Sequence, residues 1–483
     1  MEVFTCLLDN SAAKGLFPYH PMCKGIKLTH LCFADDLLVF SDGSNNGIQE
    51  MQQVLEQFKK VSGLKSNPSK CEVFFGGLDK EEKKIRAARY GYKLGEFPVR
   101  YLGVPLISGK LSLSSCQSLI DKIVAKVKSW QAKSLSYAGR IELVGKVLYS
   151  LTQFWMSVFL LPKSVIKEVE RICSNYIWGV GVGTKLRANV LWQKITYLKK
   201  EGGLGFRDMW SWNQACMVRH LWLILLQEGS LWVAWIHNYK LKGRDLWSYS
   251  CTSGSWNWRK VLKLRGKIAS FISSSGGELR FKNAPMPTYS IKRVWQTLRH
   301  VQQTVNWWKL VWKGKAIPRN RVITWLVIRG NINTKERMKR WGYSGGMECC
   351  LCGTGVEDRD HLYACCPFSR RVLESVFVKF MQIPVMQSWD EVVALIMSKL
   401  GGITEATETG KLIWQAWVSY IWRERCRRLY SAEEKSCNVL VKEIKSEVEC
   451  LLGSHRVSLF WDSLSIVVCL GSCSVVYYNQ FCF

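Results

Sequence analysis

Two adjacent carboxylates, Asp35 and Asp36, stand between apolar runs in the segment LCFADDLLVF. An ionised carboxylate in such surroundings is costly unless a metal ion or a cationic group compensates its charge. Paired carboxylates that share two divalent ions can support in-line phosphoryl displacement, because the ions bind both the attacking and the leaving oxygen. The segment therefore predicts a metal-dependent nucleotidyl-transfer centre.

The same two residues could instead belong to an ordinary turn. Asp-Asp pairs are common in turns, and the β-rich runs on either side could form a hairpin whose tip faces water. Neighbouring side chains on a strand point to opposite faces, so both carboxylates can meet the same ions only at a tight hairpin tip. A complete site would also need a further carboxylate from elsewhere.

A second candidate metal site lies in the segment MECCLCGTGVEDRDHLYACCPFSRR, which begins at Met347. It contains a CxxC pair and an HxxxxC pair within 18 residues. Four such ligands suit tetrahedral zinc, and a site filled by four protein atoms is structural because no position remains for a catalytic water. The predicted ligands are Cys349, Cys352, His361 and Cys366.

The spacing does not select one ligand set. Cys350 and Cys365 are each adjacent to a predicted ligand and could replace it. Ordinary buried thiols in a cysteine-rich chain are the alternative to a metal site, because free cysteine often packs as a small apolar residue.

The composition indicates a folded protein with an anionic partner. The 483 residues include 68 Lys and Arg against 38 Asp and Glu, a formal charge of +30, while 48% are hydrophobic. Such a surplus favours binding to nucleic acid, weakened by salt. A soluble cationic surface without a specific partner is the alternative. Cations that could contact phosphate flank the cysteine cluster: Arg319, Arg321, Arg329, Lys335, Arg337, Lys339, Arg340, Arg370 and Arg371.

The elements that must position these residues read as an α+β, multidomain chain. Residues 28–41 predict a β-hairpin with the two Asp residues at its tip. Residues 46–61 have apolar side chains at helical spacing. A short strand and a charged helix near 79–91 follow, and residues 112–227 are mainly helical.

The cysteine usage and the chain ends bear on location. The 19 Cys show no regular framework outside the one cluster, and no secretory signal is recognisable at the N-terminus. We therefore expect an intracellular, reducing location, nuclear or cytoplasmic. Residues 463–483 carry no charge, but their Ser, Asn, Gln and Gly content makes a poor spanning helix, so we expect a buried or fortuitous segment rather than a membrane anchor.

Several segments resemble one known family. LTHLCFADDLLVFSDG, SGLKSNPSK and FPVRYLGVPL resemble, in order, the catalytic segment, the next palm segment and the primer-grip hairpin of reverse transcriptases from plant LINE-type non-LTR retrotransposons. LSYAGRIELVGKVLYS, EGGLGFRDMWSWNQA and YSIKRVWQTLR through DHLYACCPFS resemble the region behind that polymerase and its zinc-binding domain. The similarity covers about residues 1–375.

The resemblance implies roles for individual residues. Asp35 and Asp36 would belong to the palm's magnesium-binding pair, and Lys70 would lie near the phosphates of the incoming nucleotide. The four predicted zinc ligands match the family's zinc pattern. The primer-gripping turn would comprise Tyr101, Leu102, Gly103, Val104 and Pro105. The implied partners are an RNA template, a DNA primer or an RNA/DNA hybrid, without a small-molecule cofactor.

The resemblance also has departures. The family's palm uses another Asp on an earlier strand, but Asp9 is the only Asp among the 34 residues before Asp35, in a helix-like context. We therefore expect the C-terminal part of such an RNA-directed DNA polymerase, lacking the fingers and the first catalytic Asp and not competent for polymerisation alone. The alternatives are a non-catalytic, zinc-stabilised RNA- or DNA-binding protein, or a pseudogene product without a selected role.

The expected domains follow the order of these segments. They are a partial reverse-transcriptase palm at residues 1–108, a mainly helical thumb-like or connection-like region at 109–286, a zinc-binding domain at 287–375, and a helical C-terminal region with the apolar tail at 376–483.

Overall fold

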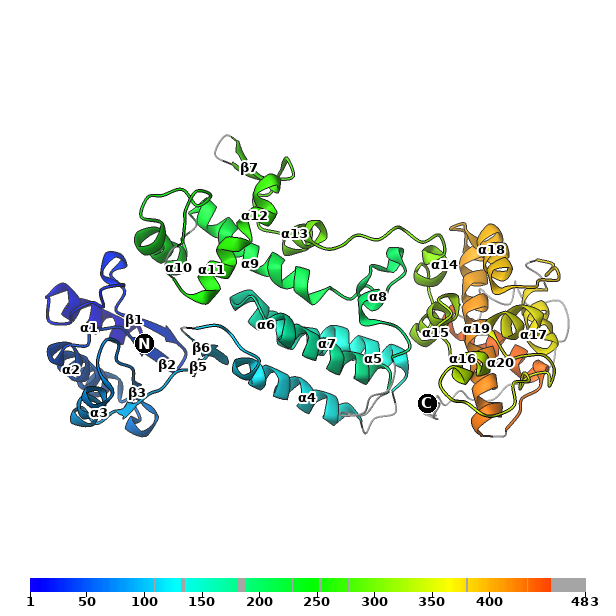
Figure 1. Ribbon diagram of the computed structural model, residues 1–483, viewed down its shortest axis with the longest axis horizontal. Coiled ribbons are helices and arrows are strands. Elements are labelled where there is room, and N and C mark those ends of the chain that lie inside the picture. The colour runs from blue at the N-terminus through cyan, green and yellow to red at the C-terminus, as the bar shows by residue number, and fades with distance from the viewer. Residues whose placement is uncertain are drawn as a thin grey trace. The chain divides into compact units, whose positions relative to one another are not determined.

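The computed structural model describes residues 1–107, 109–131, 135–179, 188–227, 229–251, 254–275, 278–378, 381–431 and 433–452 (Figure 1). The apolar tail at 463–483 lies outside these residues. The chain forms two compact units that alternate along the sequence. Unit 1 comprises Met1–Leu119, Gln153–Ile166 and Met209–Arg299, and unit 2 comprises Ile120–Thr152, Lys167–Asp208 and the chain from His300 onward.

The described residues are mainly helical with small sheets, in agreement with the coarse α+β expectation. The predicted division at residues 108, 286 and 375 remains a prediction. Within the described ranges, none of the helices combines the length and the apolarity that crossing a bilayer requires.

Among the helices of unit 1, the first two α-helices along the chain pack against the first β-hairpin. In α2 (Asn45–Ser62), the Ser44 hydroxyl accepts a hydrogen bond from Gly47 N at 3.1 Å, and Gly63 ends the helix with a φ of +73°. These caps satisfy backbone groups that a helix end leaves open. The other helices are α1 (Glu2–Ala13), α3 (Lys80–Arg89), α9 (Met209–Leu226), α10 (Leu231–Trp235), α11 (Trp256–Lys263), α12 (Arg265–Ile268) and α13 (Ile291–Leu298).

The strands of unit 1 form separate small sheets. The first hairpin pairs β1 (His30–Phe33) with β2 (Asp36–Val39), and Phe33 lies opposite Asp36. Another hairpin pairs β5 (Val99–Tyr101) with β6 (Val104–Leu106). The remaining strands are β3 (Glu72–Val73), parallel to β4 (Lys93–Leu94), and the antiparallel set β7 (Ile272–Ser275), β8 (Glu278–Phe281) and β9 (Ala284–Pro285).

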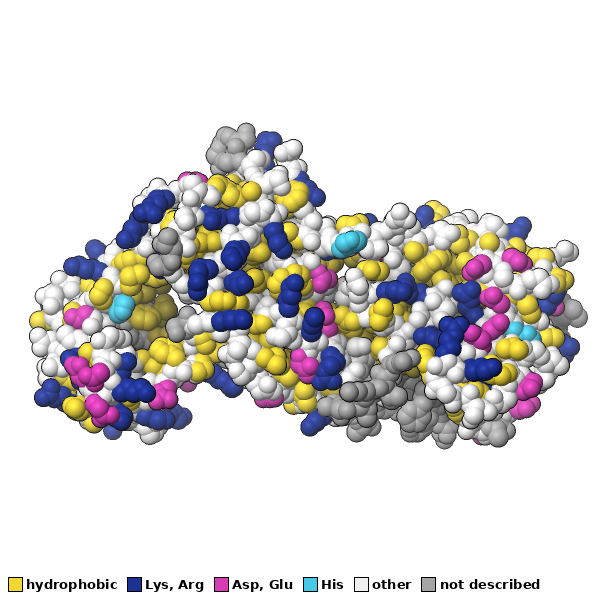
Figure 2. Space-filling view, viewed as in Figure 1, with side chains coloured by type: hydrophobic (Ala, Val, Ile, Leu, Met, Phe, Trp, Pro, Cys, Tyr) yellow, Lys and Arg dark blue, Asp and Glu magenta, His cyan; other side chains and the backbone are white. Residues whose placement is uncertain are grey.

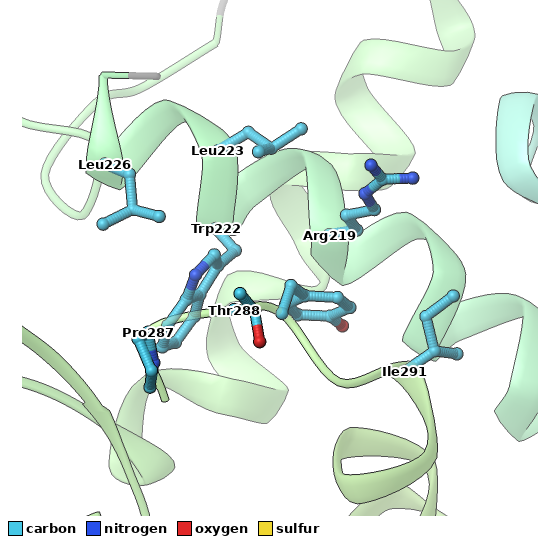
Figure 3. A pocket seen from close by; sticks show the side chains of 8 residues that line it. Arg219, Trp222, Leu223, Leu226, Pro287, Thr288 and Ile291 are labelled. Atoms are coloured by element: carbon cyan, nitrogen blue, oxygen red, sulfur yellow. The ribbon is translucent and has the colours of Figure 1, made fainter. Parts of the chain in front are cut away.

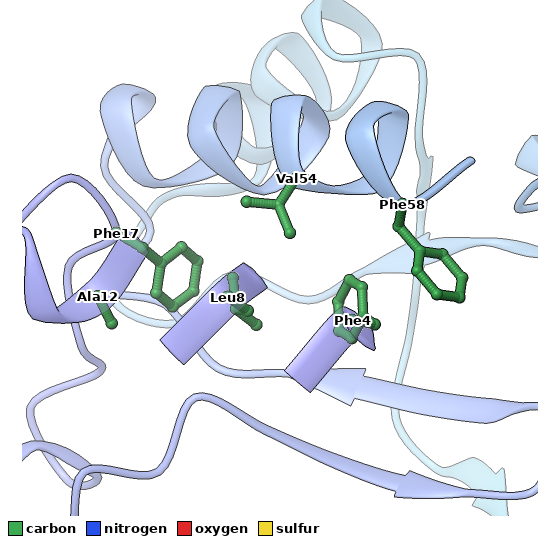
Figure 4. Packing of buried hydrophobic residues seen from close by; sticks show 6 residues of the cluster. All are labelled: Phe4, Leu8, Ala12, Phe17, Val54 and Phe58. Atoms are coloured by element: carbon green, nitrogen blue, oxygen red, sulfur yellow. The ribbon is translucent and has the colours of Figure 1, made fainter. Parts of the chain in front are cut away.

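A buried cluster between α1 and α2 supports the first hairpin (Figure 4). Its members are Phe4, Leu8, Ala12, Phe17, Val54 and Phe58. Leu37 and Val39 of β2 pack against this cluster. Because side chains alternate along a strand, Asp36 lies on the other face of β2, away from the core. The predicted hairpin at 28–41 and the predicted helix at 46–61 are both confirmed.

Helices α4 (Gln117–Gln131), α6 (Tyr149–Val158) and α7 (Lys163–Ile177) have residues in both units. Together with α5 (Tyr137–Leu143) and α9 they confirm the helical character predicted for residues 112–227. The helices within unit 2 are α5 (Tyr137–Leu143), α8 (Trp192–Thr196), α14 (Trp308–Trp312), α15 (Pro318–Ile328), α16 (Lys335–Lys339), α17 (Pro367–Phe377), α18 (Trp389–Leu400), α19 (Glu405–Tyr430) and α20 (Cys437–Leu452).

Helix α19 is the centre of the C-terminal part of unit 2, where it packs against α15, α17, α18 and α20 (Figure 1). Trp414 and Trp417 of this helix are fully buried, and Trp414 stacks on Trp389 with ring centroids 5.9 Å apart. The Trp417 indole donates a hydrogen bond to Ser369 O of α17 at 3.1 Å. These tryptophans therefore hold the core and are not exposed for base stacking.

Candidate functional site

The structure brings the four predicted zinc ligands together in unit 2. The ligand atoms of Cys349, Cys352, His361 and Cys366 all lie within 4.8 Å of one another. The Sγ atoms of Cys349 and Cys366 are 3.9 Å apart, and Cys352 Sγ is 3.3 Å from His361 Nε2. A tetrahedral zinc ion with ordinary bond lengths places two sulfurs about 3.8 Å apart, and sulfur and nitrogen about 3.6 Å apart. The donor set and its spacing therefore fit zinc.

The local fold explains how two distant ligand pairs converge. The first pair lies in a tight knuckle, in which Gly353 N donates to Cys349 O at 2.8 Å and Cys349 N donates to Gly355 O at 2.9 Å. The second pair spans a π-helical turn, His361–Cys365, followed by Cys366 as the N-cap of α17. Pro367 suits the first position of that helix because its missing N–H would have no partner there. One end of α17 is thus placed beside the knuckle.

The protonation chemistry also suits a cation. The hydrogen bond to Cys366, followed by burial, raises the pKa of the Cys349 thiol well above its ordinary value, so a thiolate there requires a compensating positive charge. Burial lowers the pKa of His361, which favours the neutral imidazole that a metal ion needs. Zinc bound by these four residues would hold the two ligand pairs together as a structural cross-link.

The structure also separates the ligands from the adjacent alternatives. The Cys350 thiol lies outside the cluster and donates to Glu357 Oε2 at 2.9 Å. The Cys365 thiol is directed to Gln387 O at 3.3 Å. Each of these two thiols contacts a group outside the cluster. The structure therefore favours Cys349 over Cys350 and Cys366 over Cys365 as zinc ligands.

A buried ion pair anchors the knuckle to α19. Glu357 is 0% exposed and Arg425 is 1% exposed. Arg425 Nε donates to Glu357 Oε1 at 2.9 Å, and Arg425 Nη2 lies 2.8 Å from the same oxygen as an ion pair. Lys335 N donates to the same carboxylate at 3.1 Å. One carboxylate therefore joins the loop between the ligand pairs to α16 and α19.

A second charged group from α19 contacts the knuckle backbone. Arg428 donates to Leu351 O at 3.1 Å and to Cys350 O at 3.4 Å. Glu424, which is fully buried, accepts from Arg428 Nε at 3.0 Å and thereby orients it. These contacts lie outside the metal ligands but fix the backbone that carries two of them.

We expect Gly355→Ala to weaken zinc binding much more than Gly353→Ala. Both glycines lie in the knuckle with positive φ, +72° and +75°, so alanine carries a comparable backbone cost at each position. A Cβ at Gly355 would lie 2.9 Å from His361 Nδ1, whereas a Cβ at Gly353 would meet nothing within 4 Å. Changes to the groups that orient a metal ligand typically cost about 10–100-fold in metal affinity. Competition with a chromophoric chelator measures the difference, and equal losses in the two variants would contradict the proposed His361 contact.

The two adjacent carboxylates lie at the predicted hairpin tip in unit 1. Ala34, with a φ of +53°, and Asp35 form the two-residue connection, and Asp36 begins β2. Both Asp residues are exposed, and Phe33 is 62% exposed. The expectation that apolar flanks bury this pair and make its charge costly is therefore wrong, because Leu37 and Val39 of β2 face the core and the two carboxylates do not.

A third carboxylate does not join this pair among the described residues. The Cys and His cluster is the one group of three or more possible ligands that the described part of the chain brings together. Asp9 lies on α1, as expected, and its Oδ1 accepts from the Thr29 hydroxyl at 2.7 Å. The described residues near Asp35 and Asp36 do not fit a two-metal centre.

The predicted primer-gripping turn is a hairpin. Leu102 and Gly103, with φ values of +51° and +82°, connect Tyr101 to Val104, which lie opposite each other. Val104 and Pro105 are buried. Burial, and then the negative charge of Asp36, raises the pKa of Tyr101, so the turn lies within electrostatic range of the paired carboxylates.

Lys70 is exposed at the end of a 3₁₀ turn, Pro68–Lys70. Within the described chain, no hydrogen bond or ion pair joins its ammonium group to Asp35 or Asp36. Its predicted role near nucleotide phosphates remains a prediction.

A pocket of about 330 Å³ lies in unit 1 between α9 and the segment that leads into α13 (Figure 3). Its lining is aromatic and aliphatic, with Arg219 as the charged member. The Tyr289 hydroxyl is already satisfied by Ala215 O at 2.6 Å, and Trp222 is fully buried. The pocket therefore offers a ligand few polar side chains, and no sequence motif predicted it.

The cations that flank the cluster divide into structural and exposed groups. Arg329 donates to Gly202 O at 2.8 Å, and Arg321 donates to Gly314 O. Lys335 is buried, and its ammonium donates to Glu348 O at 2.7 Å. Lys339 and Arg340 remain exposed. Sequence spacing alone could not separate cations that hold backbone carbonyls from cations available to a partner.

Two family models match the chain, one over the segment with the paired carboxylates and one over the segment with the Cys and His cluster. Residues 6–106 match the family model described as reverse transcriptase (RNA-dependent DNA polymerase), and residues 289–372 match the model described as zinc-binding in reverse transcriptase. The second match contains all four converging ligands. The chain therefore contains two segments similar to reverse-transcriptase domains, and one of them holds a Cys and His cluster suited to structural zinc.

Two relatives come from Arabidopsis thaliana. A putative ribonuclease H protein is 29% identical over 186 residues, which is 37% of this chain and 30% of that protein. An uncharacterized mitochondrial protein is 27% identical over 115 residues, which is 23% of this chain and 75% of that protein. The chain thus spans less than a third of the length of the first relative.

Proposed function

We propose that this chain is the C-terminal part of a plant LINE-type non-LTR retrotransposon reverse transcriptase, and that it binds nucleic acid through a zinc-held module without polymerising on its own. The observation that carries the proposal is the convergence of four zinc ligands within the matched zinc-binding domain. The order of the matched segments, with the paired-carboxylate segment first and the zinc-binding segment later, supports the placement in the parent enzyme.

Charge supports nucleic acid as the partner. Nucleic acid carries a condensed layer of counterions, and a protein with a formal charge of +30 would release them as its cations neutralise phosphates. RNA template, DNA primer and RNA/DNA hybrid all present the required phosphate backbone. Zinc would supply a rigid cross-link rather than a reaction step, so the protein's own basic side chains would make the contacts.

The polymerase part of the proposal rests on Asp35 and Asp36. Both lie at an exposed hairpin tip, and the described residues supply no third carboxylate beside them. A carboxylate pair without that partner would hold divalent ions too loosely to orient a primer terminus and an incoming nucleotide. The matched segment would then be inherited from a parent enzyme that carried out the reaction, without carrying it out in this chain.

We expect the purified chain not to extend a primer annealed to an RNA template in the presence of Mg²⁺ and deoxynucleotides. The physical reason is the incomplete carboxylate set, so adding Mn²⁺ should not restore extension. Denaturing gels resolve single-nucleotide additions and provide the measurement. Extension that disappears in Asp35→Ala and Asp36→Ala would refute the proposal, while Asp42→Ala, an exposed acidic residue after the hairpin, controls for non-specific effects of the substitution.

A further inference from the structure

A second pocket, of about 310 Å³, lies in unit 2, where the chain leaves α15 and enters α16. Its lining is mainly polar and carries three arginines against one carboxylate: Asn331, Thr334, Glu336, Arg337, Arg340 and Arg359. Figure 2 shows dark-blue Lys and Arg side chains gathered over α15 and α16, with carboxylates beside them. No motif predicted a pocket at this position, although the sequence placed Arg337 and Arg340 among the candidate phosphate contacts.

The three guanidinium groups differ in how far their charge is already compensated. Arg359 lies 3.3 Å from Asp360 and 3.7 Å from Asp390, so two carboxylates share its charge. Arg340 pairs with Glu336 at 2.6 Å, but its side chain is 71% exposed. Surface pairs of this kind contribute little and exchange readily.

Arg337 has neutral partners for its hydrogen bonds. It donates through Nη2 to Asn189 O at 3.1 Å and through Nη1 to Gly330 O at 3.3 Å and Ile332 O at 3.4 Å. Its guanidinium also lies over the Trp341 ring, 5.1 Å from the centroid. Burial, followed by the nearby charge of Arg340, lowers the pKa of Arg337. The geometry therefore holds a rigid positive charge that an anion in the pocket would stabilise.

We propose that this pocket binds a backbone phosphate of nucleic acid, with Arg337 as the fixed charge and Arg340 as the group that leaves Glu336 to contact the phosphate. Two guanidinium groups, one from α16 and one from its C-cap residue, match the several acceptor oxygens of a phosphate. Glu336 acts as an internal competitor for Arg340. This inference rests on the proposed nucleic-acid binding and assigns it to one site.

The test measures binding of a short labelled single-stranded RNA to the zinc-loaded full chain by fluorescence anisotropy at several salt concentrations. Arg340→Ala should weaken binding roughly three- to tenfold and lower the log–log salt slope by about 0.7, because one phosphate contact is lost. Glu336→Gln should tighten binding by roughly two- to threefold, since Arg340 is released from its competitor. A gain in affinity would separate release of Arg340 from the loss of binding expected when the pocket is damaged.

Matched controls come from a second Arg–Glu pair of unit 2, on α7. Arg171 and Glu168 form an i,i+3 ion pair at 2.6 Å outside the pocket. Arg171→Ala and Glu168→Gln remove the same charges, so each should change affinity by less than about twofold if the effect is local. Zinc content of each variant verifies the fold.

Two results would overturn the inference in different ways. If the wild-type chain binds RNA but the pocket variants behave like their matched controls, binding is diffuse and the phosphate pocket is wrong, while the proposed function stands. If the wild-type chain does not bind RNA at low salt, the proposed function falls and takes this inference with it.

Discussion

Cys349→Ser is expected to remove zinc from the protein and to unfold the module around the cluster. Cys349 is fully buried, and its Sγ lies 3.9 Å from Cys366 Sγ, so a weakly coordinating hydroxyl cannot take its place. Structural zinc contributes about 10–16 kcal/mol of apparent binding free energy in small modules. A domain's total stability is only about 5–15 kcal/mol, so the loss is large enough to abolish local folding.

The measurement is zinc per chain by atomic emission, together with limited proteolysis of the region 330–378. Cys365→Ser is the matched control, because Cys365 is adjacent to a ligand but exposed and directed toward Gln387 O. This control should retain one zinc and the wild-type cleavage pattern. Full zinc content in Cys349→Ser, or loss of zinc in the Cys365 control, would show that the ligand set is wrong.

Glu357→Gln is expected to destabilise unit 2 by about 3–5 kcal/mol, because it leaves the buried Arg425 without its counter-charge. Arg425 is 1% exposed and cannot turn to water without opening the packing of α19. The same change weakens the contacts of the Lys335 backbone and of the Cys350 thiol to that carboxylate. Urea unfolding followed by tryptophan fluorescence measures the change in free energy.

Two comparisons isolate the buried charge. Glu374→Gln breaks an exposed Arg–Glu pair and should cost less than about 1 kcal/mol. Adding Arg425→Met to Glu357→Gln should recover part of the lost stability, because the uncompensated charge disappears. A double variant that is less stable than the sum of both single changes would argue against burial of an unpaired charge as the cause.

The sequence predicted what local patterns can encode. The hairpin at 28–41 follows from β-rich runs around a two-residue tip, and the helix at 46–61 follows from apolar positions such as Val54 and Phe58, which are buried. The zinc ligands were identifiable because their spacing within 18 residues reflects one compact turn and one helix start. These features depend on neighbours close in sequence.

Long-range features were not predictable in the same way. Arg425 lies 68 residues after Glu357, and no local pattern signals that the two meet. Glu357 lies in the loop between the two ligand pairs, so its position could have suggested a charged contact near the zinc site. The sequence around Arg425 gave no indication that this residue is the partner. Burial of Asp35 and Asp36 was overestimated because apolar neighbours on a strand can face a core while the carboxylates face water.

The most direct test of the account is the salt dependence of nucleic-acid binding by the zinc-loaded wild-type chain. We predict that affinity for the labelled RNA falls steeply and linearly on a log–log plot as salt rises, and that chelation of zinc weakens binding further. Binding that is insensitive to salt, or that persists unchanged after zinc is removed and the module has unfolded, would contradict the role assigned to this basic, zinc-held module.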